Sequence, residues 1–150
     1  MTEEDLKELF GEIALEYGFK KHRYMFVKEY DKFILRISLQ NYLGNDNYHF
    51  NCYFLIKDMN SSSTLSSFLT ADITGHEKFV TDECEVETIS LKDYSKEEIS
   101  NIIRNSIDKL MKIIETTGVS GYLKENPEII PNIPIRSKEY LEKEGIIQRN

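Results

Sequence analysis

The sequence predicts an α+β fold: an antiparallel β-sheet of four to five strands, with an N-terminal helix and a long C-terminal helix packed on one face. Apolar residues recur at helical spacing over residues 6–17 and again over residues 99–114. Between them, residues 24–57 alternate between apolar and polar side chains with the period of two that is typical of strands. The 150 residues amount to one domain, so we expect a single domain over residues 1–150.

The first helix is expected to begin at Thr2, whose side chain can cap it, with Asp5 in the first turn. Gly18 is expected to end it. The apolar stripe between them consists of Leu6, Leu9, Phe10, Ile13, Ala14 and Tyr17.

Two hairpins are predicted after this helix. Residues 24–27 and 33–40 form the first pair of strands around a polar turn at 29–32, and residues 48–57 form the next strand after a loop at 41–47. The apolar faces of the second and third strands coincide only if paired residue numbers sum to an odd value such as 87 or 89. This register places the polar side chains of both strands on one face; they are Arg36, Ser38, Gln40, His49, Asn51 and Tyr53.

The stretch GNDNYHFNC, residues 44–52, gathers residue types found in metal and catalytic sites. His49 and Cys52 are an odd number of residues apart, so in a regular strand they point to opposite faces and cannot bind one metal ion. Asp46 lies among residues that favour turns. The stretch is therefore interpreted as a turn that runs into a strand.

The second half of the sheet is predicted less sharply. Serine-rich residues 60–67 are expected to form a loop, and residues 69–73 and 86–91 two short strands. Residues 74–83, TGHEKFVTDE, are expected to form an exposed connection between them.

Ser95 and Glu98 form the capping box of the long second helix, which carries a wide apolar stripe and is expected to end at Gly118. Residues 119–150 are then predicted to form an extended, proline-bearing segment, followed by a short last helix at 137–144.

Composition disfavours some classes of partner. The net charge of −7, with 26 acidic and 19 basic residues, disfavours nucleic acid and anionic membranes and would favour a basic partner. The sequence contains neither an apolar run long enough to span a membrane nor the basic-then-apolar start of a signal peptide. A cytoplasmic protein is expected, and its two cysteines suit a reducing compartment.

Chemical motifs are scarce. The sequence has no phosphate-binding glycine loop and no CxxC, HExxH or GxSxG, so no cofactor, metal site or catalytic residue is predicted. His76 with Glu77, Asp82, Glu83 and Cys84 offers metal-binding types without a helical spacing to organise them, which favours a solvated acidic loop. Cys52 is expected on the core face between two phenylalanines, where a thiol is inert.

The best candidate site is therefore the polar sheet face, with Arg36, Gln40, His49, Asn51 and Tyr53 as ligand- or partner-binding residues. Apolar residues share one end of this face; they are Met25, Val27, Ile34 and Leu55. Three interpretations stay open: a solvated surface, a surface covered by the C-terminal segment, or a binding site.

The stretch from Glu16 to Asp58 resembles the bacterial domain of unknown function 4304 family, and the resemblance covers about the first 60 residues. It rests on Gly18-Phe19-Lys20, Phe26, Gln40 and Asn51, although Cys52 and Tyr53 stand where a glycine is usual. The resemblance implies a small α+β domain without assigned catalysis, in which Gln40 and Asn51 are paired features of adjacent strands.

Two functional hypotheses follow. The favoured one is a protein-interaction module without catalytic activity, comparable to bacterial immunity-type inhibitors, because the chain is acidic, lacks catalytic motifs and has a half-apolar sheet face. The alternative is a small-ligand-binding or hydrolytic domain that uses the polar face of the sheet.

Overall fold

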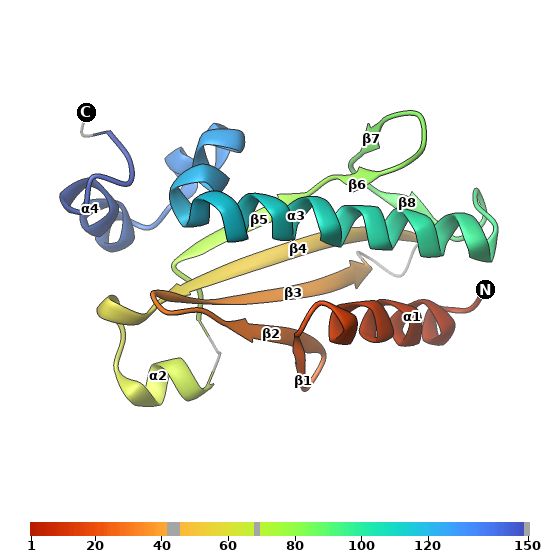
Figure 1. Cartoon of the computed structure of the whole chain (residues 1–150), viewed down its shortest axis with the longest axis horizontal. Helices are drawn as coiled ribbons and strands as arrows, with labels where there is room; N and C mark the ends of the chain where they lie inside the picture. Colours follow the sequence, from red (N-terminus) through yellow and green to blue (C-terminus); the bar gives the residue numbers. More distant parts are fainter. Residues whose placement is uncertain (42–45, 68–69, 149–150) are drawn as a thin grey trace.

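The computed structural model describes residues 1–41, 46–67 and 70–148. Within these ranges the chain is an α+β domain with an antiparallel sheet in the order β1-β2-β3-β4-β5, and β8 pairs with β4 beyond the end of β5 (Figure 1). A separate two-stranded ribbon is formed by β6 and β7. The predicted fold class is confirmed, and the described part of the sheet has six strands where four to five were expected.

The strands are β1 (Lys20–His22), β2 (Met25–Glu29), β3 (Phe33–Asn41), β4 (Asn47–Ile56), β5 (Ile73–Glu77), β6 (Phe79–Val80), β7 (Glu85–Val86) and β8 (Ile89–Ser90). The helices are α1 (Glu3–Glu16), α2 (Ser62–Ser67), α3 (Lys96–Glu125) and α4 (Ile135–Lys143), with 3₁₀ segments η1 (Lys57–Met59) and η2 (Pro127–Asn132).

Both long helices begin at the caps that the sequence predicts, and each cap is a capping box. Thr2 caps α1 in a reciprocal pair with Asp5, and Ser95 caps α3 in a reciprocal pair with Glu98. Each cap satisfies amide groups that the first turn of a helix leaves without an intrahelical acceptor.

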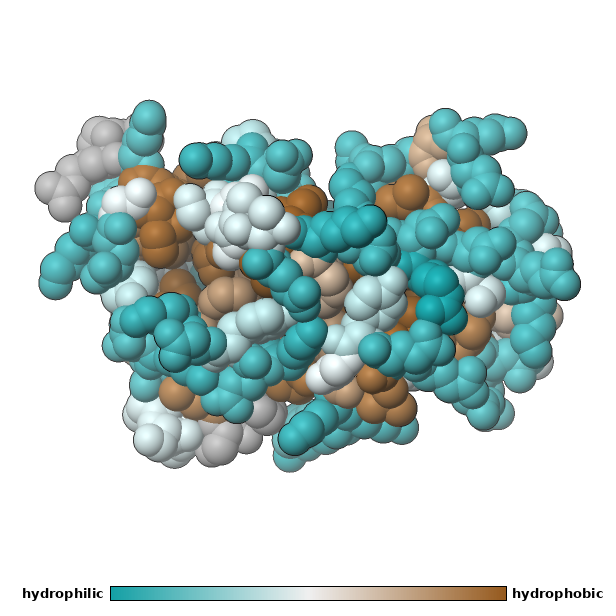
Figure 2. Space-filling view, viewed as in Figure 1, coloured by the Kyte–Doolittle hydropathy of each residue, from teal (hydrophilic) through white to brown (hydrophobic). Residues whose placement is uncertain are grey.

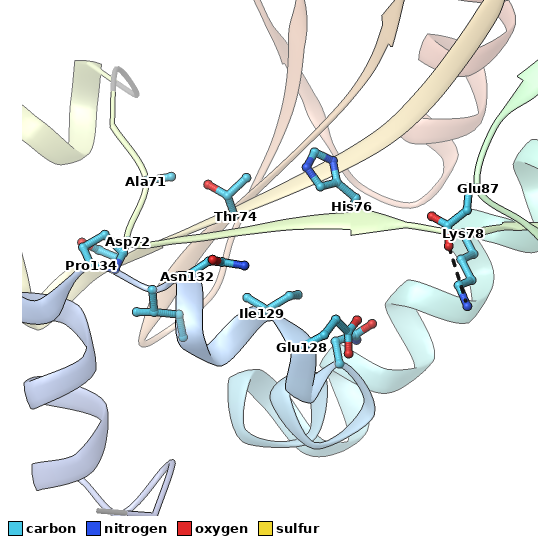
Figure 3. Close-up of a pocket in the computed structure, with 12 residues that line it drawn as sticks. Ala71, Asp72, Thr74, His76, Lys78, Glu87, Glu128, Ile129, Asn132 and Pro134 are labelled. Atoms are coloured by element: carbon cyan, nitrogen blue, oxygen red, sulfur yellow. Dashed lines mark ion pairs between the residues drawn. The ribbon is translucent and has the colours of Figure 1, made fainter. Parts of the chain in front are cut away.

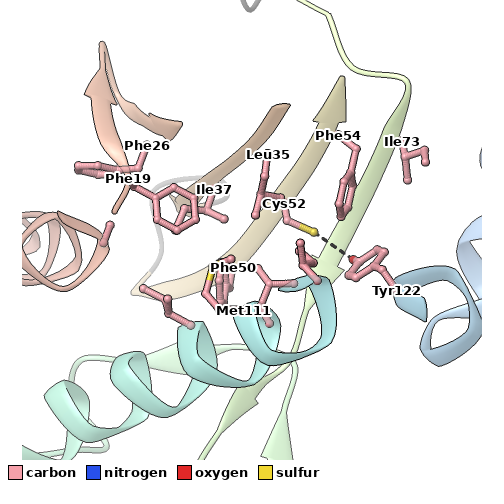
Figure 4. Close-up of a cluster of buried hydrophobic side chains, with 14 of the residues drawn as sticks. Phe19, Phe26, Leu35, Ile37, Phe50, Cys52, Phe54, Ile73, Met111 and Tyr122 are labelled. Carbon is pink, nitrogen blue, oxygen red and sulfur yellow. Dashed lines mark hydrogen bonds between the residues drawn. The ribbon is translucent and has the colours of Figure 1, made fainter. Parts of the chain in front are cut away.

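Helices α1 and α3 pack on the same face of the sheet, which we call the core face (Figure 4). Phe10 of α1 makes edge-to-face ring contacts with Phe26 and Phe50, at centroid distances of 5.7 and 5.9 Å. Tyr122 of α3 packs on Phe54 at 4.8 Å. The large aromatic side chains of the central strands thus anchor both helices, and burying each contributes about 1.5–3 kcal/mol before entropy is considered.

The register between β3 and β4 agrees with the parity argument. Phe33 pairs with Ile56 and Ser38 with Asn51, so paired numbers sum to 89. The opposite face, which we call the outer face, therefore carries the polar residues of both strands. The apolar end predicted for this face is also present, since Met25, Ile34 and Leu55 are buried there.

Helix α3 is interrupted where the sequence predicts its end. Gly118 has φ 65° and ψ −157°, a conformation that only glycine adopts easily, and helical structure then resumes as far as Glu125. The expected extended segment is therefore wrong over residues 119–132, because Pro127 stands at the start of η2, where its fixed φ also suits a helical turn.

Other local predictions also need correction. Residues 62–67 form helix α2 within the stretch predicted as a loop, and β7 and β8 belong to different sheets although one strand was predicted over residues 86–91. Residues 42–45, in the predicted loop, and residue 69, in a predicted strand, lie outside the described residues. The expected exposed connection at 74–83 instead contains β5 and β6, with Phe79 fully buried.

The helix side of the molecule is largely hydrophilic, and hydrophobic side chains are visible in the gaps between its elements (Figure 2). Among the described residues, no helix has the length and apolar character needed to cross a bilayer.

Candidate functional site

The outer face brings the five predicted site residues together in two groups. Arg36 pairs with Tyr53 across β3 and β4, and Gln40 pairs with His49. Asn51 lies between the two pairs and donates to Gln40 Oε1 from Nδ2 at 2.7 Å. Ser38, opposite Asn51, separates the groups.

Asn51 links β3 to β5. It is 0% exposed, and its Oδ1 lies 2.6 Å from Nδ1 of His76, its register partner on β5. Because Nδ2 donates to Gln40, Oδ1 is the acceptor, so the neutral His76 ring carries its proton on Nδ1. The ring's Nε2 then keeps a lone pair, which can accept a hydrogen bond or a proton.

Arg36 is buried, with 4% of its surface exposed, and its neighbours hold the guanidinium in a fixed position. Its guanidinium donates to the carbonyl oxygen of Thr70 at 2.6 Å and lies over the Tyr53 ring, with Cζ 5.2 Å from the centroid. Burial lowers the pKa of Arg36 from its ordinary value, and the negative charge of Asp72 opposes that shift. An arginine remains charged under such conditions.

Two hollows open on this face and share Ala71 and Thr74 in their walls. The first, of about 540 Å³, lies between β5 and η2, and we call it the acidic hollow. Thr74 and His76 project from the same side of β5 here (Figure 3). Its charged lining residues are Asp72, Glu87 and Glu128 with Lys78, and Lys78 pairs with Glu87 at 3.8 Å.

The second hollow, of about 330 Å³, is lined by His22, Arg23, Tyr24, Arg36 and Tyr53, and we call it the basic hollow. Met25 forms part of its wall together with Ser67 and Thr70. The apolar end of the outer face thus adjoins Ser67, at the end of α2, and Thr70, while the 3₁₀ segment η2 of the C-terminal region lies along β5.

The tight turn between β1 and β2 forms the rim of the basic hollow. Arg23 has φ 58°, the one positive φ of a non-glycine residue among the described residues. Such a conformation is uncommon for arginine and is found where the surroundings enforce it. The turn presents Tyr24 to solvent with 76% of its surface exposed.

Asp72 fastens the segment that precedes β5. Its Oδ2 accepts from the amide of Ile56 at 2.7 Å and from Asn60 Nδ2 at 2.9 Å, and its Oδ1 accepts from Ser137 at 3.4 Å. The carboxylate therefore has a structural role at the wall of the acidic hollow.

A second polar network lies on the core face. Tyr122 donates to Glu77 Oε1 at 2.5 Å, and its hydroxyl lies 3.0 Å from Cys52 Sγ (Figure 4). Burial raises the pKa of Glu77, and burial together with the charge of Glu77 raises the pKa of the Cys52 thiol. The Cys52 thiol is inert and lies on the opposite side of the sheet from His49 and His76. Neither histidine can therefore activate it as a nucleophile.

The candidate metal cluster of the 76–84 region is not assembled. His76 projects from the outer face, Glu77 is buried on the core face, and Cys84 is exposed in a turn with Thr81. No group of three or more potential metal-binding side chains occurs in the described ranges 1–41, 46–67 and 70–148.

Sequence reasoning missed Arg23, Tyr24, Thr74 and His76 as parts of this face. The parity rule could have found His76, because the odd-sum argument extends from β4 to β5 once residues 73–77 are treated as a strand. Comparisons with family models, with curated proteins and with solved structures found no match for this chain. The resemblance noted over residues 1–60 therefore remains a prediction.

Proposed function

We propose that this chain is a protein-interaction module that binds its partner on the outer face of the sheet, around Tyr24. The observation that carries the proposal is the exposure of Tyr24, 76%, beside a hollow that contains Arg36 and Tyr53. Tyrosine and arginine are enriched among the residues that dominate binding energy at protein interfaces.

The preorganisation of this surface supports the proposal. Arg36 is held by Thr70 and Tyr53, and Asn51 holds both Gln40 and His76. Side chains that are already fixed lose little entropy when a partner binds, so more of the contact energy appears as affinity. The net charge of −7 would in addition speed the approach of a partner with a basic surface.

The test compares Tyr24→Ala with Leu15→Ala. Both residues are large and exposed, Leu15 at 56%, but Leu15 lies on α1, a helix of the core face. Neither truncation should change stability by more than about 0.5 kcal/mol. Proteins that bind the wild-type chain would be quantified by mass spectrometry after affinity capture with all three chains.

A protein retained by wild type and Leu15→Ala but lost with Tyr24→Ala would be the expected partner. Its dissociation constant, measured with the purified proteins, should rise at least about 30-fold on Tyr24→Ala, as for a hot-spot residue. Equal binding to all three chains would refute the proposed surface.

Small-ligand binding is the second candidate function, and the acidic hollow is the observation that favours it. Its volume of about 540 Å³ is within the range of small-molecule sites, and Asn51 sets the tautomer of His76 in its wall. A thermal-shift screen with metabolites tests this candidate, and a rise in melting temperature that His76→Phe abolishes would support it.

A further inference from the structure

We infer that the basic hollow is a binding pocket for an oxyanion group, a carboxylate or a phosphate. The inference concerns the same face as the proposed docking surface, but it does not require a protein partner.

Basic side chains converge on this hollow from two parts of the sheet. Arg36 comes from the central strand β3, and Arg23 and His22 come from the turn and edge strand at β1. Arg23 carries a planar guanidinium whose paired N–H groups match the two oxygens of a carboxylate or phosphate. Arg36 adds a second guanidinium, which already donates to the Thr70 carbonyl from one of its nitrogens. His22 adds a ring that can donate a hydrogen bond in its neutral or its charged form.

The sign of the hollow's charge runs against that of the whole chain. The chain carries 26 acidic and 19 basic residues, yet among the described residues that line this hollow none is an aspartate or glutamate. The adjoining acidic hollow contains three carboxylates and one lysine. The excess of basic side chains over carboxylates is therefore a property of this site and not of the general surface.

The basic hollow is also preorganised for binding. Arg36 is 4% exposed, and the Thr70 carbonyl and the Tyr53 ring fix its guanidinium before any ligand binds. Low-dielectric walls strengthen the attraction between this guanidinium and an anion, compared with an arginine in open water. Tyr24 and Tyr53 supply hydroxyl groups that can donate to further oxygen atoms of the anion.

The size of the hollow limits what it can hold. A volume of about 330 Å³ lies at the small end of ligand pockets. It accommodates one carboxylate or phosphate group with a few attached atoms, and a larger ligand would have to extend over Thr74 toward the acidic hollow.

The test is an NMR titration of the ¹⁵N-labelled chain with two probes, sodium glutarate and inorganic phosphate, at constant ionic strength. We expect saturable shifts of the amide signals of residues 22–24, 36 and 70, and of the Arg36 Nε–H signal. The probe that binds more tightly identifies the class of oxyanion. A saturating response to either one supports the inference.

Two variants with the same change of charge provide the control. Arg23→Gln should weaken binding about tenfold, because one charge-assisted contact is lost. Lys21→Gln should leave the dissociation constant unchanged, because Lys21 pairs with Phe26 and therefore lies off the outer face. Shifts that do not saturate, or equal weakening by both variants, would overturn the inference.

This outcome is separable from that of the proposed function. Suppose that wild type and Lys21→Gln bind an oxyanion but no protein partner depends on Tyr24. This result would support the oxyanion pocket and refute the docking surface. A partner that depends on Tyr24, with no saturable oxyanion binding, would do the reverse.

Discussion

Replacing Gly75 by alanine tests the tightest contact in the core-face network. A Cβ at this position would lie 2.0 Å from the Tyr122 hydroxyl oxygen and 3.1 Å from Cys52 Sγ. Tyr122 cannot yield freely, since its hydroxyl donates to Glu77 at 2.5 Å and its ring packs on Phe54. Overpacking costs about 1–3 kcal/mol, and the weakened hydrogen bond about 1 kcal/mol more. We therefore expect Gly75→Ala to lower the free energy of unfolding by about 2–4 kcal/mol.

A double-mutant cycle with Tyr122→Phe isolates the cause. Tyr122→Phe alone should cost about 1–3 kcal/mol, because it leaves the buried Glu77 carboxyl without this donor. In the double variant the new methyl group no longer meets a hydroxyl, and its nearest neighbours are Cζ of residue 122 and Cys52 Sγ, each at 3.1 Å. A small shift can relieve contacts of that length, so the double variant should cost at least about 1 kcal/mol less than the two single changes combined.

Urea denaturation followed by far-UV circular dichroism measures all four proteins, since the chain has no tryptophan to report by fluorescence. As a control, Gly75→Ala should be additive with Ser95→Ala, which lies at the distant N-terminus of α3. Additivity within about 0.5 kcal/mol for the Gly75 and Tyr122 pair as well would show that the hydroxyl does not face Gly75.

Three further outcomes are expected. Burial raises the pKa of Glu77 above its ordinary value of 4.5. The folded chain therefore binds the Glu77 proton more tightly than the unfolded chain does. The stability that this proton confers is lost as the pH rises from 4.5 through the folded-state pKa. Glu77→Gln keeps an acceptor for Tyr122 and should remove the loss of stability that comes from deprotonation of Glu77. The urea midpoint of the variant minus that of wild type should therefore increase with pH. A difference that stays constant with pH would refute this. Ser95→Ala should cost about 1 kcal/mol in urea denaturation by loss of the α3 cap, and no loss would show that the capping box is not formed. In native protein, Ellman's reagent should label the exposed Cys84 rapidly and Cys52, which is 0% exposed, only on unfolding; rapid labelling of both thiols would place Cys52 at the surface.

The β3–β4 register was predictable because alternation has a period of two. A shift by one residue would have turned Leu35 and Ile37 to the outer face, so only an odd sum kept the core intact. The same reasoning predicts Gln40 and Asn51 on one face, where the structure joins them by a hydrogen bond. It also placed Cys52 on the core face.

Strand β5 was not predicted because its core-facing residues are not hydrophobic enough to show the alternation of apolar and polar residues that is typical of a strand. Gly75 and Glu77 point toward the helices, and Thr74 and His76 point away, so every position from 74 to 77 reads as polar or small. The Tyr122 hydroxyl explains the two unusual inward residues: it requires a glycine where it approaches the strand and an acceptor at Glu77. The determining residue lies 45 positions away from Glu77 in the sequence, beyond the reach of local patterns.

The C-terminal region shows a different limit of sequence reasoning. Proline excludes a backbone hydrogen bond, which suggested an extended chain, but its φ is equally compatible with the first turn of a helix. Ile129 and Ile133 are buried against the core, and that burial selects the compact form of residues 127–132. Their spacing of four residues is helical and is a local signal for this form.

The cost of the outer face is itself an argument that it binds something. Burying Asn51 and Arg36 is unfavourable unless every polar group finds a partner, and well-packed apolar residues would serve the fold at least as well. In return the face gains a His76 ring in one tautomer and an Arg36 fork in one position, each in the wall of a hollow. Departures from the simplest way of stabilising a sheet are expected where function requires them. Here they coincide with the basic hollow and the exposed Tyr24, which makes this face, rather than the helix-covered one, the place to search for a partner or a ligand.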